Sequence, residues 1–227
     1  MIWISIITAA ACLFAVFTIV IMYQQKQRQY IILKTITSAG FLLVAMRAGI
    51  GGCSREVFVF VMPALILCFL GDVFLAAAHE IDNNLKDPWF TMGVASFAAA
   101  QALMSWELAR LIDFNFRPTI ILSVVMVAIV WYTARSGRWD YGKNKIPSII
   151  YAFLIGLFCG LGLNYIWIMG LNTQTLLFGA GSCLFLISDF TLSCKYFKVT
   201  KQKYLGAAVL ITYYLATYMI AIYLHTV

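Results

Sequence analysis

The sequence predicts an all-α, polytopic membrane protein: one integral membrane domain over residues 1–227, folded as a bundle of eight transmembrane helices. Composition is the first observation behind this prediction. Hydrophobic residues make up 63% of the chain and charged residues 11%, against about a quarter charged in a typical soluble domain. The second is eight apolar runs, most of them near the roughly 20 residues that a helix needs to cross a bilayer. A β-barrel would show short alternating segments instead.

The runs predict eight spans in order. The first is followed, not preceded, by positive charges, so it reads as a retained helix and not as a signal peptide. The second carries Lys34 near its start, and the fourth has a small-residue face of Gly93, Ser96 and Ala100 at helical spacing, suited to close packing. The sixth has a glycine-rich face of Gly156, Gly160 and Gly162. The predicted spans are residues 3–23, 30–46, 56–79, 89–111, 117–134, 146–169, 173–194 and 203–225.

A buried carboxylate occurs twice in matching sequence contexts. The third span contains LCFLGDV with Asp72, and the seventh contains LFLISDF with Asp189. The offset, 189 − 72 = 117, is about half of the chain and pairs Lys34 with Tyr151. It predicts two parallel four-helix repeats, with halves at about residues 1–115 and 116–227. Ionisable residues inside a membrane are costly and usually functional, so both aspartates are candidate catalytic residues.

Loop charges predict the orientation. Eleven Lys and Arg residues flank the loops after the odd-numbered spans and four lie on the opposite side, which makes the former side cytoplasmic. Both termini are then extracytoplasmic, in a multi-pass protein of the cell membrane. Lys34, Tyr151, Asp72 and Asp189 are all expected in the cytoplasmic third of the membrane, in one polar cavity open to that side. If the two carboxylates are close, one is expected to be protonated and the other ionised, as an acid and base pair.

The same composition argues against other classes. The net charge of +7 comes from these juxtamembrane loops, which favours contact with membrane lipids and not with nucleic acid. Six cysteines without CxxC spacing and two histidines predict neither disulfides nor a metal site. No cofactor is expected.

Each candidate has a structural alternative. The aspartates could form buried ion pairs with Lys34 that fix helix register, or Lys34 could extend to the membrane surface without a partner. Gln101 and Thr217 could be interhelical hydrogen-bonding residues, and Tyr151 and Tyr213 could be packing residues.

Several motifs in order along the chain resemble the YhhN/TMEM86 lysoplasmalogenase family. They are LKTITS at 33–38, GD at 71–72, GVASFAAAQ at 93–101, Tyr151 shortly after a proline, GAGSCLFLISD at 179–189 and TYYLAT at 212–217. The family pattern has proline where this chain has Thr35, histidine where it has Gln101, and glutamine where it has Thr217.

The resemblance implies an eight-helix membrane hydrolase that cleaves the vinyl ether bond of lysoplasmalogens into a fatty aldehyde and a glycerophospho-headgroup, without metal or cofactor. It implies Asp72 and Asp189 as the acid and base pair on a lysophospholipid substrate. The substrate-binding or supporting residues are then Lys34, Ser96, Gln101, Tyr151, Ser188, Tyr213 and Thr217. The glycine-rich face of the sixth span could then border a slot for the acyl chain.

Two other functions fit the same residues. Intramembrane carboxylates in a repeat also suit a small proton-coupled transporter. The changes at Gln101 and Thr217 suit a lipid-binding protein without catalysis.

Overall fold

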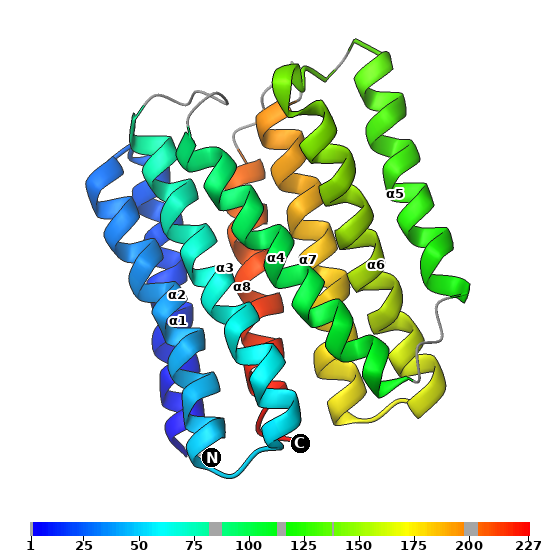
Figure 1. The fold of residues 1–227 in the computed structure, drawn as a ribbon. Helices are drawn as coiled ribbons and strands as arrows, with labels where there is room; N and C mark the ends of the chain where they lie inside the picture. The colour runs from blue at the N-terminus through cyan, green and yellow to red at the C-terminus, as the bar shows by residue number, and fades with distance from the viewer. Residues whose placement is uncertain (1, 82–87, 113–116, 138, 198–203) are drawn as a thin grey trace. The chain divides into compact units, whose positions relative to one another are not determined.

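The computed structural model describes residues 2–81, 88–112, 117–137, 139–197 and 204–227, and this part of the chain contains eight α-helices (Figure 1). A short 3₁₀-helix, Gly142–Asn144, precedes the sixth. The helices are α1 (Ile2–Tyr23), α2 (Gln27–Ile50), α3 (Arg55–Ile81), α4 (Pro88–Leu111), α5 (Arg117–Arg135), α6 (Lys145–Met169), α7 (Thr173–Phe197) and α8 (Leu205–Tyr223).

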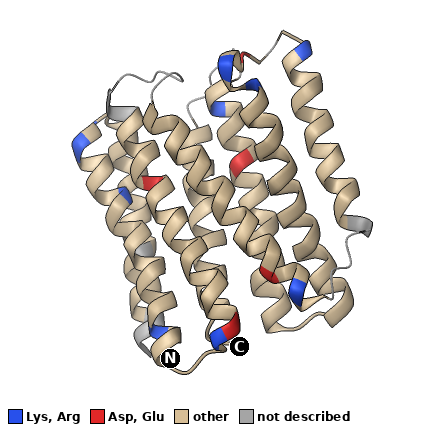
Figure 2. Cartoon of the chain, viewed as in Figure 1, with Lys and Arg blue, Asp and Glu red and all other residues tan. Residues whose placement is uncertain are grey.

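Helix formation is confirmed for all eight predicted spans, but only six helices among the described residues are long and apolar enough to cross a membrane: α1, α2, α3, α6, α7 and α8. The apolar part of α5 is shorter, and α4 does not qualify. The second half of α4 carries Gln101, Ser105, Glu107 and Arg110, which lower its hydropathy. Charged residues lie mostly near helix ends (Figure 2), as expected for a multi-pass membrane protein. Five basic residues used in the orientation prediction lie outside the described residues: Lys86, Arg138, Lys198, Lys201 and Lys203.

The helices form two compact units that do not follow the predicted halves. One unit contains residues 1–100 and 217–227, and the other contains residues 101–216. The divisions fall inside α4 and inside α8. The first unit therefore holds Asp72 and Lys34, and the second holds Asp189 and Tyr151.

Close backbone packing in the first unit depends on glycines in α3 and α4. A Cβ built on Gly71 would lie 2.7 Å from the ring of Phe97, and one on Gly93 would lie 2.9 Å from Leu75. The predicted close packing of the α4 face at Gly93 is thus confirmed. The end of α8 joins α2, because the Tyr218 hydroxyl donates to the backbone oxygen of Thr37 at 3.0 Å.

In the second unit the glycine face of α6 packs against α5. A Cβ on Gly156 would lie 2.7 Å from the Cα of Ser123, and one on Gly160 would lie 2.9 Å from the Cα of Thr119. Backbone of α5 therefore occupies the side of Gly156 and Gly160, where the family resemblance suggested an acyl-chain slot. Helix α7 packs on α6, where the rings of Phe158 and Phe185 meet edge to face at 6.1 Å.

Candidate functional site

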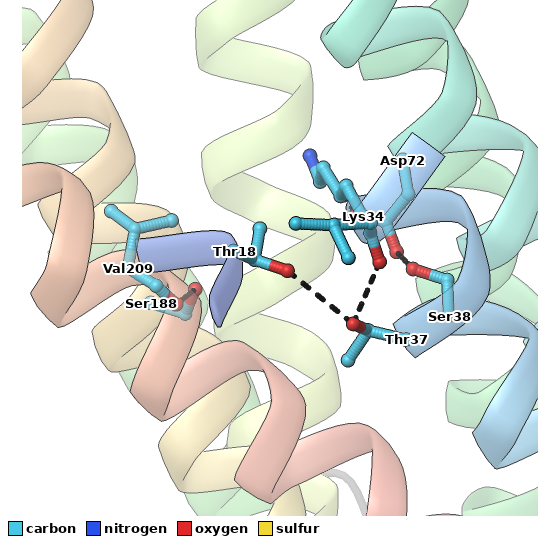
Figure 3. Close-up of polar contacts among 8 residues, drawn as sticks. Thr18, Lys34, Thr37, Ser38, Asp72, Ser188 and Val209 are labelled. Carbon is cyan, nitrogen blue, oxygen red and sulfur yellow. Dashed lines mark hydrogen bonds and ion pairs between the residues drawn. The ribbon is translucent and has the colours of Figure 1, made fainter. Parts of the chain in front are cut away.

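The first polar cluster is centred on Asp72, which lies within α3 and has 1% of its surface exposed. The ammonium of Lys34 on α2 lies 3.2 Å from Oδ1 of this carboxylate. One turn further along α2, the Ser38 hydroxyl donates to Oδ2 at 2.6 Å, as Figure 3 shows. The α2 residues at i and i+4 share a face, so one helix supplies both a cation and a neutral donor to the two oxygens.

This geometry decides between the two structural readings of Lys34. The lysine side chain is 8% exposed and bound to the carboxylate, so its predicted alternative, extension to the membrane surface without a partner, is wrong. The ion-pair alternative describes the contact. Burial of both charges is compensated by the pairing and by the Ser38 hydrogen bond, which is what a low-dielectric environment requires. Ser38 was not among the predicted site residues, although its spacing from Lys34 is visible in the sequence.

A second face of α2 carries neutral hydrogen bonds beside this cluster. The hydroxyls of Thr18 on α1 and Thr37 on α2 are 3.5 Å apart (Figure 3). Thr37 also donates to the backbone oxygen of Leu33 at 2.8 Å. The Thr18 contact joins α1 to α2, and the hydrogen bond from Tyr218 to the Thr37 backbone oxygen joins α8 to α2, both within one turn of Lys34.

The second polar cluster is centred on Asp189, a residue of α7 that is 9% exposed. The Tyr151 hydroxyl on α6 donates to its Oδ2 at 2.6 Å, and the Gln101 amide nitrogen on α4 donates to the same oxygen at 2.7 Å. The amide nitrogen also donates to the Tyr151 oxygen at 2.8 Å. Three helices thus meet in a closed triangle of hydrogen bonds. Because each member is hydrogen-bonded to the other two, the triangle restricts the rotamers of all three side chains.

The two clusters follow the same sequence spacing. In each, the aspartate is bound by a side chain 38 positions earlier on the preceding helix: 72 − 34 = 38 for Lys34, and the same separation for Tyr151. This is the pairing of Lys34 with Tyr151 that the sequence offset suggested. The four-helix repeat itself stays a prediction.

For the remaining predicted site residues the structure describes other contacts or only their burial. Ser188, next to Asp189, donates to the backbone oxygen of Val209 at 3.2 Å and joins α7 to α8. Tyr213 packs its ring against Phe185 at 5.6 Å. Ser96 is half-buried on α4, and Thr217 is fully buried on α8.

Together the clusters offer two buried carboxylates in different surroundings. Asp72 lies beside an ammonium, while neutral amide and hydroxyl groups bind Asp189 at a slightly exposed position. Such surroundings suit two carboxylates to different protonation states. Among the residues described, no group of three or more His, Cys, Asp and Glu side chains could hold a metal ion.

Comparison with known proteins gives one match. A family model described as YhhN family matches residues 29–224, which is most of the chain and includes both clusters. No curated protein and no solved structure matches.

Proposed function

Because the chain belongs to the YhhN family, we propose that it is a membrane hydrolase of the lysoplasmalogenase type. Its substrate would be a lysoplasmalogen, a lysophospholipid whose single chain is attached through a vinyl ether. The products would be a fatty aldehyde and glycerophosphoethanolamine or glycerophosphocholine. The observation that carries the proposal is the pair of buried carboxylates, each bound by a side chain of the preceding helix.

The reaction has chemical needs that two carboxylates can meet. Protonation of the vinyl ether at its β-carbon gives an oxocarbenium ion. Water adds to that cation and loses a proton, which forms a hemiacetal, and the hemiacetal breaks into the aldehyde and the free alcohol of the glycerol. The net change is addition of one water. One acid and one base are needed, together with negative charge that stabilises the cation.

We assign these roles to Asp72 and Asp189. One donates the proton, and the other, ionised, stabilises the oxocarbenium ion and orients the water. Lys34 would compensate charge at Asp72 or bind the substrate phosphate, since its ammonium is 3.2 Å from the carboxylate. Tyr151 and Gln101 would hold Asp189 in one rotamer. The carboxylate would then need no rearrangement as charge develops in the transition state.

The direct test uses purified protein and two substrates with the same headgroup. A lysoplasmalogen and an ester lysophospholipid are incubated separately, and released aldehyde is trapped and quantified. We expect aldehyde from the lysoplasmalogen only, and none from the Asp72→Asn or Asp189→Asn variants. Asp140→Asn is the matched control, because this exposed carboxylate binds only the Gly142 backbone N–H among the contacts described, at 3.0 Å, and asparagine preserves that bond.

Two results would contradict the proposed hydrolase activity. Aldehyde release by both aspartate variants would exclude the assigned chemistry. No aldehyde from the wild type, combined with flux of substrate or protons in proteoliposomes, would favour a transporter.

A further inference from the structure

A hydrogen-bonding acceptor beside Asp189 is left without a partner. The two N–H groups of the Gln101 amide are used by Tyr151 and Asp189. The amide oxygen, Oε1, is buried and has no hydrogen-bond partner among the described residues. Since Gln101 is fully buried, water at the protein surface does not satisfy this oxygen. Buried polar groups are nearly always paired, so an unpaired acceptor next to a functional carboxylate points to a missing donor.

A second unpartnered group lies one turn away on the same helix. Ser105 is 3% exposed, and its hydroxyl also has no hydrogen-bond partner among the residues described. Residues at i and i+4 of a helix are neighbours, with Cβ atoms about 5–6 Å apart. One atom that accepts or donates two hydrogen bonds of about 2.8 Å can bridge such a separation. This spacing therefore allows the two groups to share one ligand atom.

The chemistry of the pair selects the ligand. Gln101 Oε1 only accepts, whereas the Ser105 hydroxyl can donate. The Ser105 hydroxyl also accepts, but a ligand that uses its proton as well as Oε1 must accept from serine and donate to the amide oxygen, which is what a hydroxyl does. A carboxylate or phosphate would offer Oε1 no proton, and an ammonium, although it could donate to both oxygens, would leave the Ser105 proton without an acceptor.

We propose that Ser105 and the amide oxygen of Gln101 form a binding site for one hydroxyl group beside Asp189. The hydroxyl belongs either to a water molecule or to the free hydroxyl of a lysolipid. This inference rests on the proposed function for its substrate. In the first case the site supplies the water that captures the oxocarbenium ion. In the second it recognises the hydroxyl that distinguishes a lysolipid from a diradyl lipid, as sites built for a hydroxyl reject analogues lacking it.

The test removes the serine hydroxyl, which contributes no hydrogen bond to the described structure. Ser105→Ala is compared with Thr119→Val on α5. Thr119 is also buried, and its hydroxyl has no hydrogen-bond partner in the part of the chain that the structure describes. It packs at Gly160, nine residues along α6 from Tyr151, or about 13 Å at 1.5 Å per residue. Both variants should keep the wild-type denaturation temperature within a few degrees.

Two measurements separate the two hydroxyl sources. Aldehyde release is measured with a lysoplasmalogen and with its 2-deoxy analogue. Binding is measured as the rise in denaturation temperature caused by a saturated alkyl ether lysolipid, which has no vinyl ether to cleave, and by its 2-deoxy analogue. If the lysolipid supplies the hydroxyl, Ser105→Ala loses about tenfold in kcat/KM with the hydroxyl substrate only, and its binding shift falls with the hydroxyl lipid only. If water supplies it, kcat falls about tenfold with both substrates and both binding shifts stay unchanged.

Other outcomes overturn the site or the function separately. Ser105→Ala indistinguishable from wild type and from Thr119→Val in every measurement would overturn the hydroxyl site while aldehyde release still supported the hydrolase. If the wild type released no aldehyde, the proposed function would fail. The lipid-induced shifts in denaturation temperature would then be the test of the hydroxyl site. A smaller shift for the hydroxyl lipid in Ser105→Ala would then support recognition of the lysolipid hydroxyl. An unchanged shift would overturn the site, because the water role would already have failed together with the hydrolysis that needs it.

Discussion

Replacing Lys34 by methionine keeps most of the side-chain volume and removes the charge that faces Asp72. The two side chains are 8% and 2% exposed and the ammonium lies 3.2 Å from the carboxylate, so solvent screens the pair little. Removing one partner of a buried ion pair costs about 3–5 kcal/mol, because the other charge stays buried without compensation. The hydrogen bond from Ser38 at 2.6 Å remains and offsets part of this cost. We therefore expect Lys34→Met to lower the free energy of unfolding by about 3 kcal/mol, the lower end of that range, which is roughly two orders of magnitude in the folding equilibrium constant.

The assay is equilibrium unfolding in mixed micelles with a rising fraction of denaturing detergent, followed by tryptophan fluorescence. The double variant Lys34→Met with Asp72→Asn should recover most of the loss, since no charge is then left unpaired. Lys143→Met removes an exposed lysine and should change the free energy of unfolding by no more than about 0.5 kcal/mol. A cost below about 1 kcal/mol for Lys34→Met, the value of a solvent-exposed pair, would refute the reasoning that the pair is buried and mutually compensated.

Three further substitutions test other contacts. Tyr151→Phe removes the 2.6 Å hydrogen bond to Asp189, and we expect aldehyde release to fall about tenfold in kcat at nearly unchanged denaturation temperature; unchanged kcat would show that the bond does not support the reaction. Gly156→Ala places a Cβ 2.7 Å from the Cα of Ser123, so unfolding in mixed micelles should need about 1–3 kcal/mol less, and an unchanged midpoint would contradict the close approach of α5 and α6. Burial raises the pKa of Tyr141, outside the membrane spans, above its ordinary value of 10.0, so folding stability should fall as pH rises above 10, where the unfolded tyrosine ionises first. Tyr141→Phe should flatten that decline between pH 9 and 11 in thermal denaturation, and an unaltered slope would assign it to other groups.

The helices could be predicted because a membrane allows few alternatives. Apolar runs of about 20 residues predict helices directly, because backbone N–H and C=O groups exposed to lipid must form their hydrogen bonds within the same segment. Their ends were predicted less well. Helix α2 begins at Gln27 and ends at Ile50, beyond the predicted residues 30–46, because polar residues continue the helix after the apolar run stops.

The carboxylates could also be predicted, but only some of their partners. A charge in an apolar run stands out in a sequence, which is how Asp72 and Lys34 were identified. Gln101 and Tyr151, which bind Asp189 from two other helices, were both among the predicted supporting residues. Ser188, also predicted as a supporting residue, binds the backbone of α8, and Ser38, which binds Asp72, was not predicted. Spacing along one helix is readable from sequence, whereas the rotation of each helix toward its neighbours is set by packing.

Each carboxylate is held by contacts inside its own compact unit: Asp72 by α2, and Asp189 by α4 and α6. The two sets of described contacts share no residue. A substitution in one of these sets therefore removes no described contact of the other aspartate. A chain built in this way can vary the residues beside one carboxylate, as at Gln101, without rebuilding the lysine and serine that hold the other.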